Sequence, residues 1–153
     1  QVWGFACDLA AEDTFVELSG KPPTEKEEKK WFVDVLEKIA KKESIHIAVT
    51  VNGVYAGGGR VDRGKLRHAH VGHIGLALAP QFRDEGIGSV LMGALIDEAR
   101  KLGMRLLELS CFENNPRAHH VYEKLGFQTL GVLPGAVAFQ GGYVGEVKMY
   151  LPL

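Results

Sequence analysis

Cysteine is scarce in this sequence, and its two copies lie far apart. Cys7 and Cys111 are the only cysteines among 153 residues, so we expect neither a disulfide framework nor a cysteine-rich metal site. No apolar run approaches the length that spans a bilayer, and no signal peptide is visible, so no membrane partner is expected. A cytoplasmic location is the simplest expectation for such a chain.

An excess of charge of either sign is also missing. The chain carries 18 Lys and Arg against 19 Asp and Glu, which gives a net charge of -1. Proteins that neutralise many phosphates of a duplex normally carry a basic excess, so no nucleic acid is expected as a partner. The 46% hydrophobic and 24% charged fractions indicate a globular chain. Its length suits one core, so we expect residues 1–153 to form a single domain.

Hydrophobic periodicity predicts helices and strands in alternation. A helix over residues 24–42 is expected to start at Thr24, which can form a capping box with Glu27. Asn52-Gly53 predicts a tight hairpin within "IHIAVTVNGVYAGGGRV". The other expected elements are a short helix within 8–19, strands over 69–80 and 104–111, helices over 87–102 and 115–126, and strands over 127–133 and 143–151 joined by a loop over 134–142. The apolar face of the helix over 87–102 is expected to comprise Ile87, Val90, Leu91, Ala94, Leu95 and Leu102. This order predicts an α/β (α+β) fold, one mixed sheet with helices on its faces.

The segment "FRDEGIGSV" places Gly86 and Gly88 between a strand and a helix. Glycines at a helix entrance let an anion approach backbone N–H groups, and the helix dipole favours negative charge there. Leu91 stands where a dinucleotide fingerprint needs its third glycine, and the lysine of a Walker loop is absent. A tight turn that only packs helix on strand is the alternative. Asp84 and Glu85 are compatible with a bound anion if their side chains point to water.

Two segments together carry a family resemblance. Arg83-x-x-Gly86-x-Gly88, directly after a strand ending in "LALAP", resembles the pyrophosphate loop of the GNAT superfamily of N-acetyltransferases. The later segment "ENNPRAHHVYEKLGF" is similar to a second segment of that family, with Asn115, Ala118, Tyr122, Gly126 and Phe127 in matching places. The resemblance implies a mostly antiparallel central sheet whose splayed central strands form an acetyl-CoA cleft. It also implies acetyl-CoA as co-substrate, a primary amine as acceptor, and no metal.

The same resemblance implies which residues border the cofactor. Backbone N–H groups of the glycine loop would hold the pyrophosphate of acetyl-CoA. Acidic residues at 84 and 85 depart from the small or basic residues that the family often has there. The implied cofactor-binding residues are Leu76, Ala77, Leu78, Arg83, Asp84, Glu85, Gly86, Ile87, Gly88, Ser89, Asn115, Ala118 and Tyr122.

Acetyl transfer passes through a tetrahedral centre with negative charge on the former carbonyl oxygen, and a preorganised donor stabilises that charge. By resemblance, the strand ending at Pro80 splays and frees the backbone N–H of Leu78 for this task. Pro80 has no N–H to donate, which fits a strand that must stop pairing there. Tyr122 stands where similar enzymes place a general acid for the departing thiolate. Simple packing on the helix face is the alternative role for Tyr122.

The general base is less specifically indicated. His73 stands near a glutamate that related enzymes use, and an imidazole of pKa about 6.5 suits a base at neutral pH. Ser110 stands where some relatives carry a second glutamate. Glu113 and a water chain are further alternatives. His68, His70 and His73 match no strong zinc signature, since in a strand the first two would share a face and His73 would point oppositely.

Two rival functions remain on the sequence alone. A non-catalytic acyl-CoA-binding module would sense the cofactor without turning it over, and a nucleotide-binding regulatory domain is disfavoured by the missing glycine and lysine. For an enzyme, the helix over 24–42 and the uncharged loop over 134–142 would line the acceptor side. An uncharged, glycine-rich loop favours a peptide or protein amine slightly over a small molecule. The resemblance is compatible with a homodimer.

Overall fold

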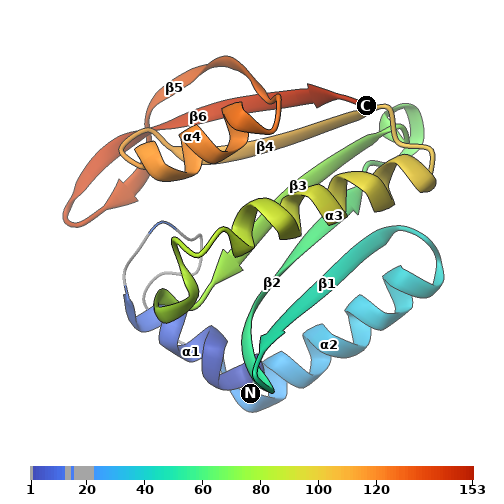
Figure 1. Cartoon of the computed structure of the whole chain (residues 1–153), viewed down its shortest axis with the longest axis vertical. Coiled ribbons are helices and arrows are strands. Elements are labelled where there is room, and N and C mark those ends of the chain that lie inside the picture. Colours follow the sequence, from blue (N-terminus) through green and yellow to red (C-terminus); the bar gives the residue numbers. More distant parts are fainter. Residues whose placement is uncertain (1, 13–14, 16–22) are drawn as a thin grey trace.

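The computed structural model describes residues 2–12, 15 and 23–153, which form four α-helices, two short 3₁₀ helices and six strands (Figure 1). The helices are α1 (Val2–Glu12), α2 (Glu25–Ala40), η1 (Leu66–His68), η2 (Pro80–Phe82), α3 (Ile87–Lys101) and α4 (Pro116–Lys124). The strands are β1 (Ser44–Val51), β2 (Val54–Arg63), β3 (Val71–Leu78), β4 (Leu106–Phe112), β5 (Gln128–Phe139) and β6 (Gly142–Pro152). Among the described helices, none is long and apolar enough to cross a membrane.

The six strands form one sheet in the order β1-β2-β3-β4-β6-β5. Neighbouring strands run antiparallel except for β3 and β4, which are parallel. The predicted mixed, mostly antiparallel sheet flanked by helices is therefore confirmed. The hairpin between β1 and β2 turns at Asn52 and Gly53, both at positive φ (51° and 79°), as the Asn-Gly pair predicts.

Helices lie on both faces of this sheet. Helices α3 and α4 cover one face, which we call the front face, with α3 running along β2 and β3 (Figure 1). Helices α1 and α2 lie against the other, back face. There the ring of Phe5 in α1 contacts Tyr55 of β2, and Trp31 in α2 contacts His46 of β1, with ring centroids 5.2 Å and 6.0 Å apart.

The core lies between the front face and α3. Its largest fully buried side chains are Met92 and Leu95 of α3, Leu107 of β4, Met149 of β6 and Val61 of β2. The buried positions of α3 are Leu91, Met92, Leu95, Ile96 and Ala99, one face of a helix. The predicted helix is confirmed, but its predicted face is rotated: Val90 is 75% exposed. Val90 and Met92 are both apolar, so the sequence alone does not show which of them faces the core. In the structure it is Met92.

Helix α2 begins as predicted and packs less than expected. Thr24 caps it in a capping box, with the Glu27 N–H donating to Thr24 Oγ1 at 3.3 Å and the Thr24 N–H donating to Glu27 Oε2 at 2.8 Å. Of its described side chains only Val35 is buried, while Phe32 and Leu36 are half exposed. The short helix predicted within 8–19 starts earlier, as α1, and residues 13–14 and 16–19 of that prediction lie outside the described residues.

The predicted loop over 134–142 is wrong. Strand β5 continues to Phe139, and the hairpin turns at Gln140 and Gly141, both at positive φ. An irregularity in the register between Leu133 and Val137 accommodates the Pro-Gly pair inside the strand. Proline is tolerated here because β5 is at the edge of the sheet, where a missing N–H removes no bond to a second neighbour.

Candidate active site

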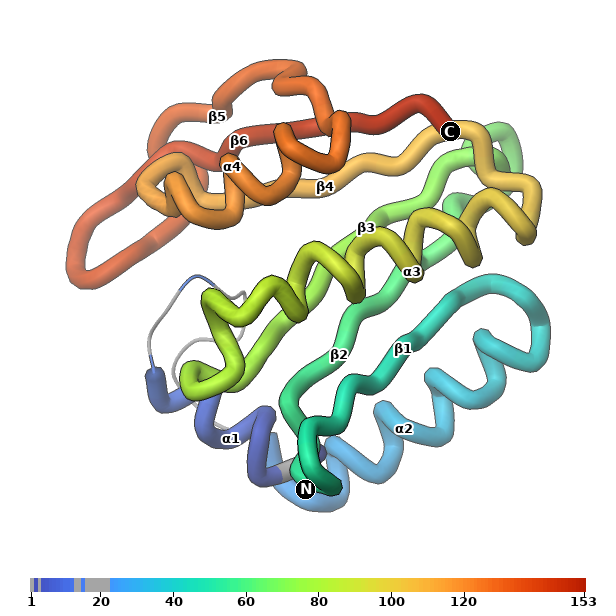
Figure 2. The backbone as a smooth tube through the Cα atoms, in the orientation of Figure 1, coloured from blue at the N-terminus to red at the C-terminus, as the bar shows by residue number. Residues whose placement is uncertain are grey.

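Strands β3 and β4, at the centre of the sheet, pair at only three positions within the described chain. The last of these pairs joins His73 to Glu108. Beyond it, β3 stays paired with β2 as far as Leu78, and β4 stays paired with β6 as far as Phe112. Because each strand follows its antiparallel neighbour, their carboxyl ends diverge (Figure 2). The predicted splay of the central strands is confirmed.

Pro80 does lie where β3 stops pairing, as expected, but it does not cause the splay. Pro80 cannot end the β3–β4 pairing, because that pairing has already ended at His73. Pro80 instead begins η2, the short turn that follows β3. The divergence is a property of the whole sheet, in which β2 and β6 each hold their own central strand.

The alternation of hydrogen bonds shows which backbone groups of β3 the splay exposes. The Ala79 N–H donates to the Ala56 carbonyl at 2.9 Å, and the Gly64 N–H donates to the Val71 carbonyl at 2.8 Å. In an antiparallel pair such bonds recur at every second residue, so the N–H of Ala77 also points to β2. The N–H groups of Leu76 and Leu78 therefore point the other way, into the splay. This orientation suits the predicted oxyanion donor at Leu78, a role that stays a prediction.

The glycine loop connects η2 to α3 with a left-handed backbone. Asp84 and Gly86 have positive φ values of 66° and 77°, and Gly86 is the N-cap of α3. The Gly86 carbonyl accepts from the N–H groups of both Ser89 and Val90, at 3.1 Å and 3.2 Å. Within the described chain, the five preceding N–H groups, at 84–88, donate to no other protein group. Unpaired N–H groups at a helix N-terminus are the donors that a bound anion uses.

Gly88 links this loop to the end of β3. A Cβ placed on Gly88 would lie 3.7 Å from Cδ1 of Leu78 and would contact nothing else described within 4 Å. The first turn of α3 therefore sits directly over the last residue of β3. The two predicted cofactor segments, the strand end and the loop, are brought together.

Arg83 has partners of its own. Its guanidinium forms a two-point ion pair with Glu12 of α1, at 2.5 Å and 2.7 Å, and its Nε donates to the Leu78 carbonyl at 2.9 Å. Both charged side chains are about three-quarters buried. Arg83 thus fastens the end of β3 to α1, and its predicted contact with the cofactor stays a prediction.

The two acidic residues of the loop, Asp84 and Glu85, are both exposed, but they differ in their partners. Glu85 is exposed to water, as the sequence suggests. Asp84 is exposed as well, and it also forms an ion pair with Arg117 at the start of α4. The sequence does not single out Arg117, although it lies within the second matching segment.

Asn115 holds the beginning of α4. Its side-chain oxygen accepts from the Ala118 N–H at 3.2 Å, and Pro116 occupies the first helical position. Two of the predicted cofactor-binding residues therefore cap this helix together. Their contact with the cofactor stays a prediction.

Tyr122 lies on the inner side of α4, packed against the core of the front face. Its ring centroid is 6.0 Å from that of Phe127. Burial raises the pKa of Tyr122 to about 12, and the nearby Cys111 thiol adds to the rise. The hydroxyl is therefore protonated at neutral pH, as a general acid must be. The structure supports packing and leaves catalysis by Tyr122 as a prediction.

His73 points to the back face, at the apex of the splay. Its Nδ1 lies 2.9 Å from Oε1 of Glu108, the residue paired with it across β3 and β4. Sequence reasoning missed this partner. The signal was available: Glu108 interrupts the apolar run of a central strand, and a carboxylate there faces the same side as its paired neighbour.

The other histidines of this region are not on the strand. His68 lies in η1 and His70 in the turn before β3, so the predicted sharing of a strand face by these two residues is wrong. Their segment folds into a 3₁₀ turn because Leu66, at positive φ, breaks the extended backbone. No group of three or more His, Cys, Asp or Glu suited to a metal occurs among the described residues.

Further along the back face, Ser110 and Lys148 form a polar row. Lys148 Nζ donates to Ser110 Oγ at 2.7 Å and lies 2.9 Å from Oε2 of Glu146, which is 22% exposed. The other candidate base, Glu113, follows β4 and donates its N–H to the Gly145 carbonyl at 2.8 Å. Glu146 is a carboxylate near the diverging end of β4 that sequence reasoning did not consider.

Three aromatic rings meet where β4 ends. Phe15 stacks on Phe139 of β5 with ring centroids 5.2 Å apart, and both rings contact Phe112 edge-on, at 5.9 Å and 5.8 Å. Phe15 thus contacts β5 beside the diverging end of β4. Phe139 belongs to the segment 134–142 predicted to line the acceptor side, whereas the predicted helix over 24–42 has no residue in the cluster Phe15–Phe112–Phe139.

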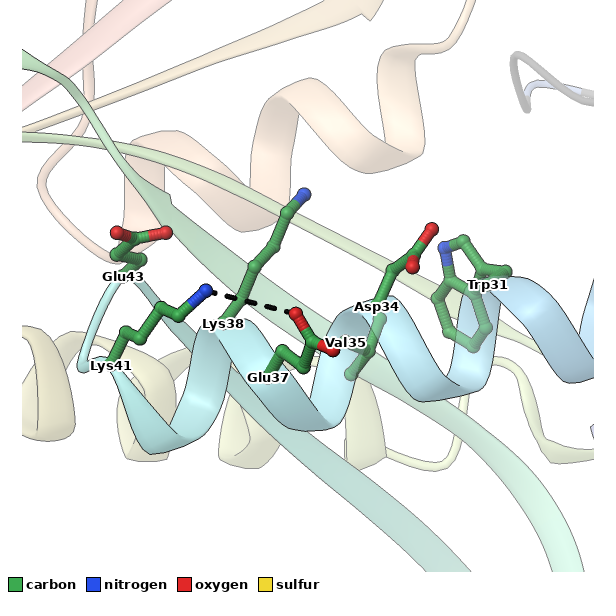
Figure 3. A pocket seen from close by; sticks show the side chains of 7 residues that line it. All are labelled: Trp31, Asp34, Val35, Glu37, Lys38, Lys41 and Glu43. Atoms are coloured by element: carbon green, nitrogen blue, oxygen red, sulfur yellow. Dashed lines mark ion pairs between the residues drawn. The ribbon is translucent and has the colours of Figure 1, made fainter.

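A separate pocket of about 340 Å³ lies along α2, far across the sheet from β4 (Figure 3). It is lined by Trp31, Asp34, Val35, Glu37, Lys38, Lys41 and Glu43. Within it Lys41 pairs with Glu37, one helical turn away, at 3.7 Å. Charges of both signs alternate along this exposed groove, so it lacks a cluster of one chemistry that would mark a catalytic site.

Comparison with known proteins bears on this arrangement. Residues 7–127 match the family described as the Acetyltransferase (GNAT) family. An Escherichia coli N-acetyltransferase, named for the alanine of ribosomal protein bS18, is 31% identical over 78 residues, 51% of this chain and 53% of that protein. The aligned part spans between a quarter and about half of the length of the curated relatives that the chain matches.

Solved structures share the fold over its whole length. A GNAT-family acetyltransferase from Streptococcus pneumoniae is 22% identical, with a TM-score of 0.89 over 99% of this chain and 92% of that one. A phosphinothricin acetyltransferase of the GNAT superfamily from Sinorhizobium meliloti, in complex with acetyl-CoA, is 16% identical, with a TM-score of 0.83 over 98% and 82% of the two chains. With its splayed central strands and a family match over most of its length, this chain belongs to the GNAT acetyltransferase family.

Proposed function

We propose that this chain is an N-acetyltransferase that moves an acetyl group from acetyl-CoA to a primary amine. The observation that carries the proposal is the divergence of β3 from β4, with three candidate groups along these two strands. These are the free N–H groups at 84–88, the N–H groups of Leu76 and Leu78, and the Tyr122 hydroxyl. Residues 1–153 would act as one domain, since every described element packs around one sheet.

The cofactor would enter on the front face. Its pyrophosphate would accept hydrogen bonds from the loop N–H groups, where the positive end of α3 also favours it. From the loop, the thioester arm would pass under the first turn of α3, beside Leu78. Acetyl-CoA as donor is supported by family membership and by its presence in the structure of the Sinorhizobium meliloti relative.

In the reaction, the amine nitrogen attacks the thioester carbon directly, and the carbon–sulfur bond breaks. Negative charge on the carbonyl oxygen of the tetrahedral intermediate would be stabilised by the Leu78 N–H, a fixed donor that needs no reorganisation. The departing sulfur takes a proton from Tyr122. The raised pKa of Tyr122, about 12, keeps that proton in place until a thiolate forms nearby.

His73 would accept the proton that the attacking ammonium loses. With Nδ1–H donating to Glu108, Nε2 of the neutral imidazole is left as the acceptor. The pair lies on the back face, opposite the side from which the cofactor would enter. A chain of water molecules would join His73 to the amine, since the dyad sits at the apex of the splay and Leu78 lies five residues further along β3.

We favour a peptide or protein amine as acceptor, a small amine being the runner-up. The acceptor side carries the Phe15–Phe112–Phe139 cluster and an uncharged hairpin edge, which provide apolar contacts and backbone groups for an extended peptide. The name of the Escherichia coli relative gives an alanine of a ribosomal protein as its acceptor, which supports the same class.

Release of the CoA thiol tests the proposal. The purified chain is incubated with acetyl-CoA and a panel of peptides with free N-termini, lysine peptides, spermidine and small amines. We expect thiol release with at least one peptide and poor turnover of spermidine. A chain that binds acetyl-CoA but releases thiol only at the uncatalysed rate would instead be the non-catalytic acyl-CoA-binding module.

A further inference from the structure

One ion pair joins the two sides of the splay on the front face. Asp84 belongs to the glycine loop at the end of β3, and Arg117 lies in the first turn of α4, above β4. Figure 1 shows that α3 and α4 both begin at the end of the sheet where β3 and β4 diverge. Asp84 and Arg117 are 72% and 64% exposed, so water reaches both side chains.

The Asp84–Arg117 ion pair offsets an unfavourable charge in the loop. Five free N–H groups at 84–88 attract an anion, while the carboxylate of Asp84 repels one at the same place. Arg117 neutralises that carboxylate in the free protein. Exposed ion pairs contribute little net stability, so an incoming anion can exchange with Asp84 readily.

We propose that Arg117 determines specificity for the phosphorylated cofactor by binding its pyrophosphate, with Asp84 holding the guanidinium at the entrance until the cofactor arrives. This inference rests on the proposed function. A guanidinium presents a planar fork of donors that matches phosphate oxygens two at a time. A pyrophosphate carries more charge than one carboxylate and would lie against the same loop, so it is the stronger partner for Arg117.

Arg83, the other arginine at the loop, is already committed elsewhere. Its guanidinium makes two contacts with Glu12 and one with the Leu78 carbonyl, and it is largely buried. Freeing it would detach β3 from α1. Arg117 has one partner that itself lies on the anion site, and no such structural task among the described residues.

Titration calorimetry of single variants with acetyl-CoA tests the proposal. Arg117→Ala should raise Kd by about tenfold to a hundredfold, the scale of a lost charge-assisted hydrogen bond, and Arg117→Lys should recover part of the loss. Asp84→Asn should lower Kd by about twofold to fivefold, because it removes a screened like charge. Asparagine is the suitable replacement, since it tolerates the positive φ of residue 84.

Matched controls separate this contact from general charge effects. Arg100→Ala removes the same charge from another exposed ion pair, with Asp97 at the far end of α3, and should leave Kd unchanged. The Arg117→Ala loss should persist with 3′-dephospho-CoA, which keeps the pyrophosphate, and should vanish with pantetheine, which has no phosphate. Circular dichroism establishes that each variant is folded.

Three results would overturn the inference. Arg117→Ala could bind acetyl-CoA like the wild type. Asp84→Asn could weaken binding as much as Arg117→Ala, which would make the pair a brace for the loop. The loss could disappear with 3′-dephospho-CoA, which would move the contact to another phosphate. A wild-type chain that binds no acetyl-CoA at all would refute the proposed function itself, a result that none of these three resembles.

Discussion

Replacing Tyr122 by phenylalanine separates its two roles, packing and proton donation. The change removes one hydroxyl and keeps the ring that contacts Phe127 and the core. If the hydroxyl protonates the departing thiolate, kcat should fall by about 10²-fold or more, the scale of lost general acid catalysis. The Kd for acetyl-CoA, measured by calorimetry, should stay close to that of the wild type.

The same variant tests the burial of the hydroxyl through its effect on stability at alkaline pH. Burial raises the pKa of Tyr122 from 10.0 to about 12, so the folded state holds the proton more tightly than the unfolded chain does. The stabilisation is complete below about pH 10 and is lost as the pH rises through 12. At one unit above the unfolded pKa the wild type should have lost about 1 kcal/mol of stability, and at most about 3 kcal/mol at higher pH.

Urea unfolding of both proteins at pH 9 and pH 11 measures this difference. Other tyrosines and lysines titrate equally in both proteins, so their contribution cancels when the free energies of unfolding are subtracted. The wild type should lose about 1 kcal/mol more than Tyr122→Phe over this interval. Equal losses would show that the hydroxyl is not desolvated, and an unchanged kcat with a working acceptor would show that Tyr122 only packs.

Three further predictions concern the glycines and the base. Gly88→Val should abolish acetyl-CoA binding in calorimetry, because the valine side chain would fill the space beneath α3. The circular dichroism spectrum should stay unchanged, because the new Cβ contacts only Leu78, at 3.7 Å. Undiminished binding would refute the loop assignment. Gly72→Ala should lower the free energy of unfolding by about 1–3 kcal/mol, since its Cβ would lie 2.6–2.8 Å from three buried side chains, whereas Gly75→Ala, with nothing within 4 Å, should change it little. His73→Gln should reduce kcat about 10²-fold with little change in stability, and wild-type turnover would exclude it as the base.

The sheet and its helices were predictable because their signals are local. The capping box at Thr24, the Asn-Gly turn and the apolar face around Leu95 each depend on residues close in sequence. The Pro-Gly pair at 134–135 misled for the same reason. Whether a Pro-Gly pair ends a strand or is tolerated within it depends on whether the strand lies at the edge of the sheet. The position of β5 in the sheet order is not a local property of the sequence.

Residues of the candidate site were predictable only where a motif carries them. The glycine loop and Tyr122 stand in recognisable segments. The ion-pair partners of other site residues, by contrast, lie far away in sequence. Glu12 holds Arg83, Glu108 holds His73, and each contact crosses between elements that only the folded sheet brings together. Periodicity places a side chain on a face, but it cannot say which side chain of another element meets it there.

The divergence of β3 from β4 accounts for why a direct transfer suits this fold. A continuous ladder would use up the N–H groups of Leu76 and Leu78, whereas the splay leaves them unpaired. Side chains alternate along both strands, so His73 faces the back while Cys111, next to Tyr122, faces the front. Burial raises the pKa of the Cys111 thiol, which keeps it protonated and a poor nucleophile. In the proposed reaction, an amine that loses its proton on the back face attacks a thioester held on the front face, with no enzyme nucleophile between them.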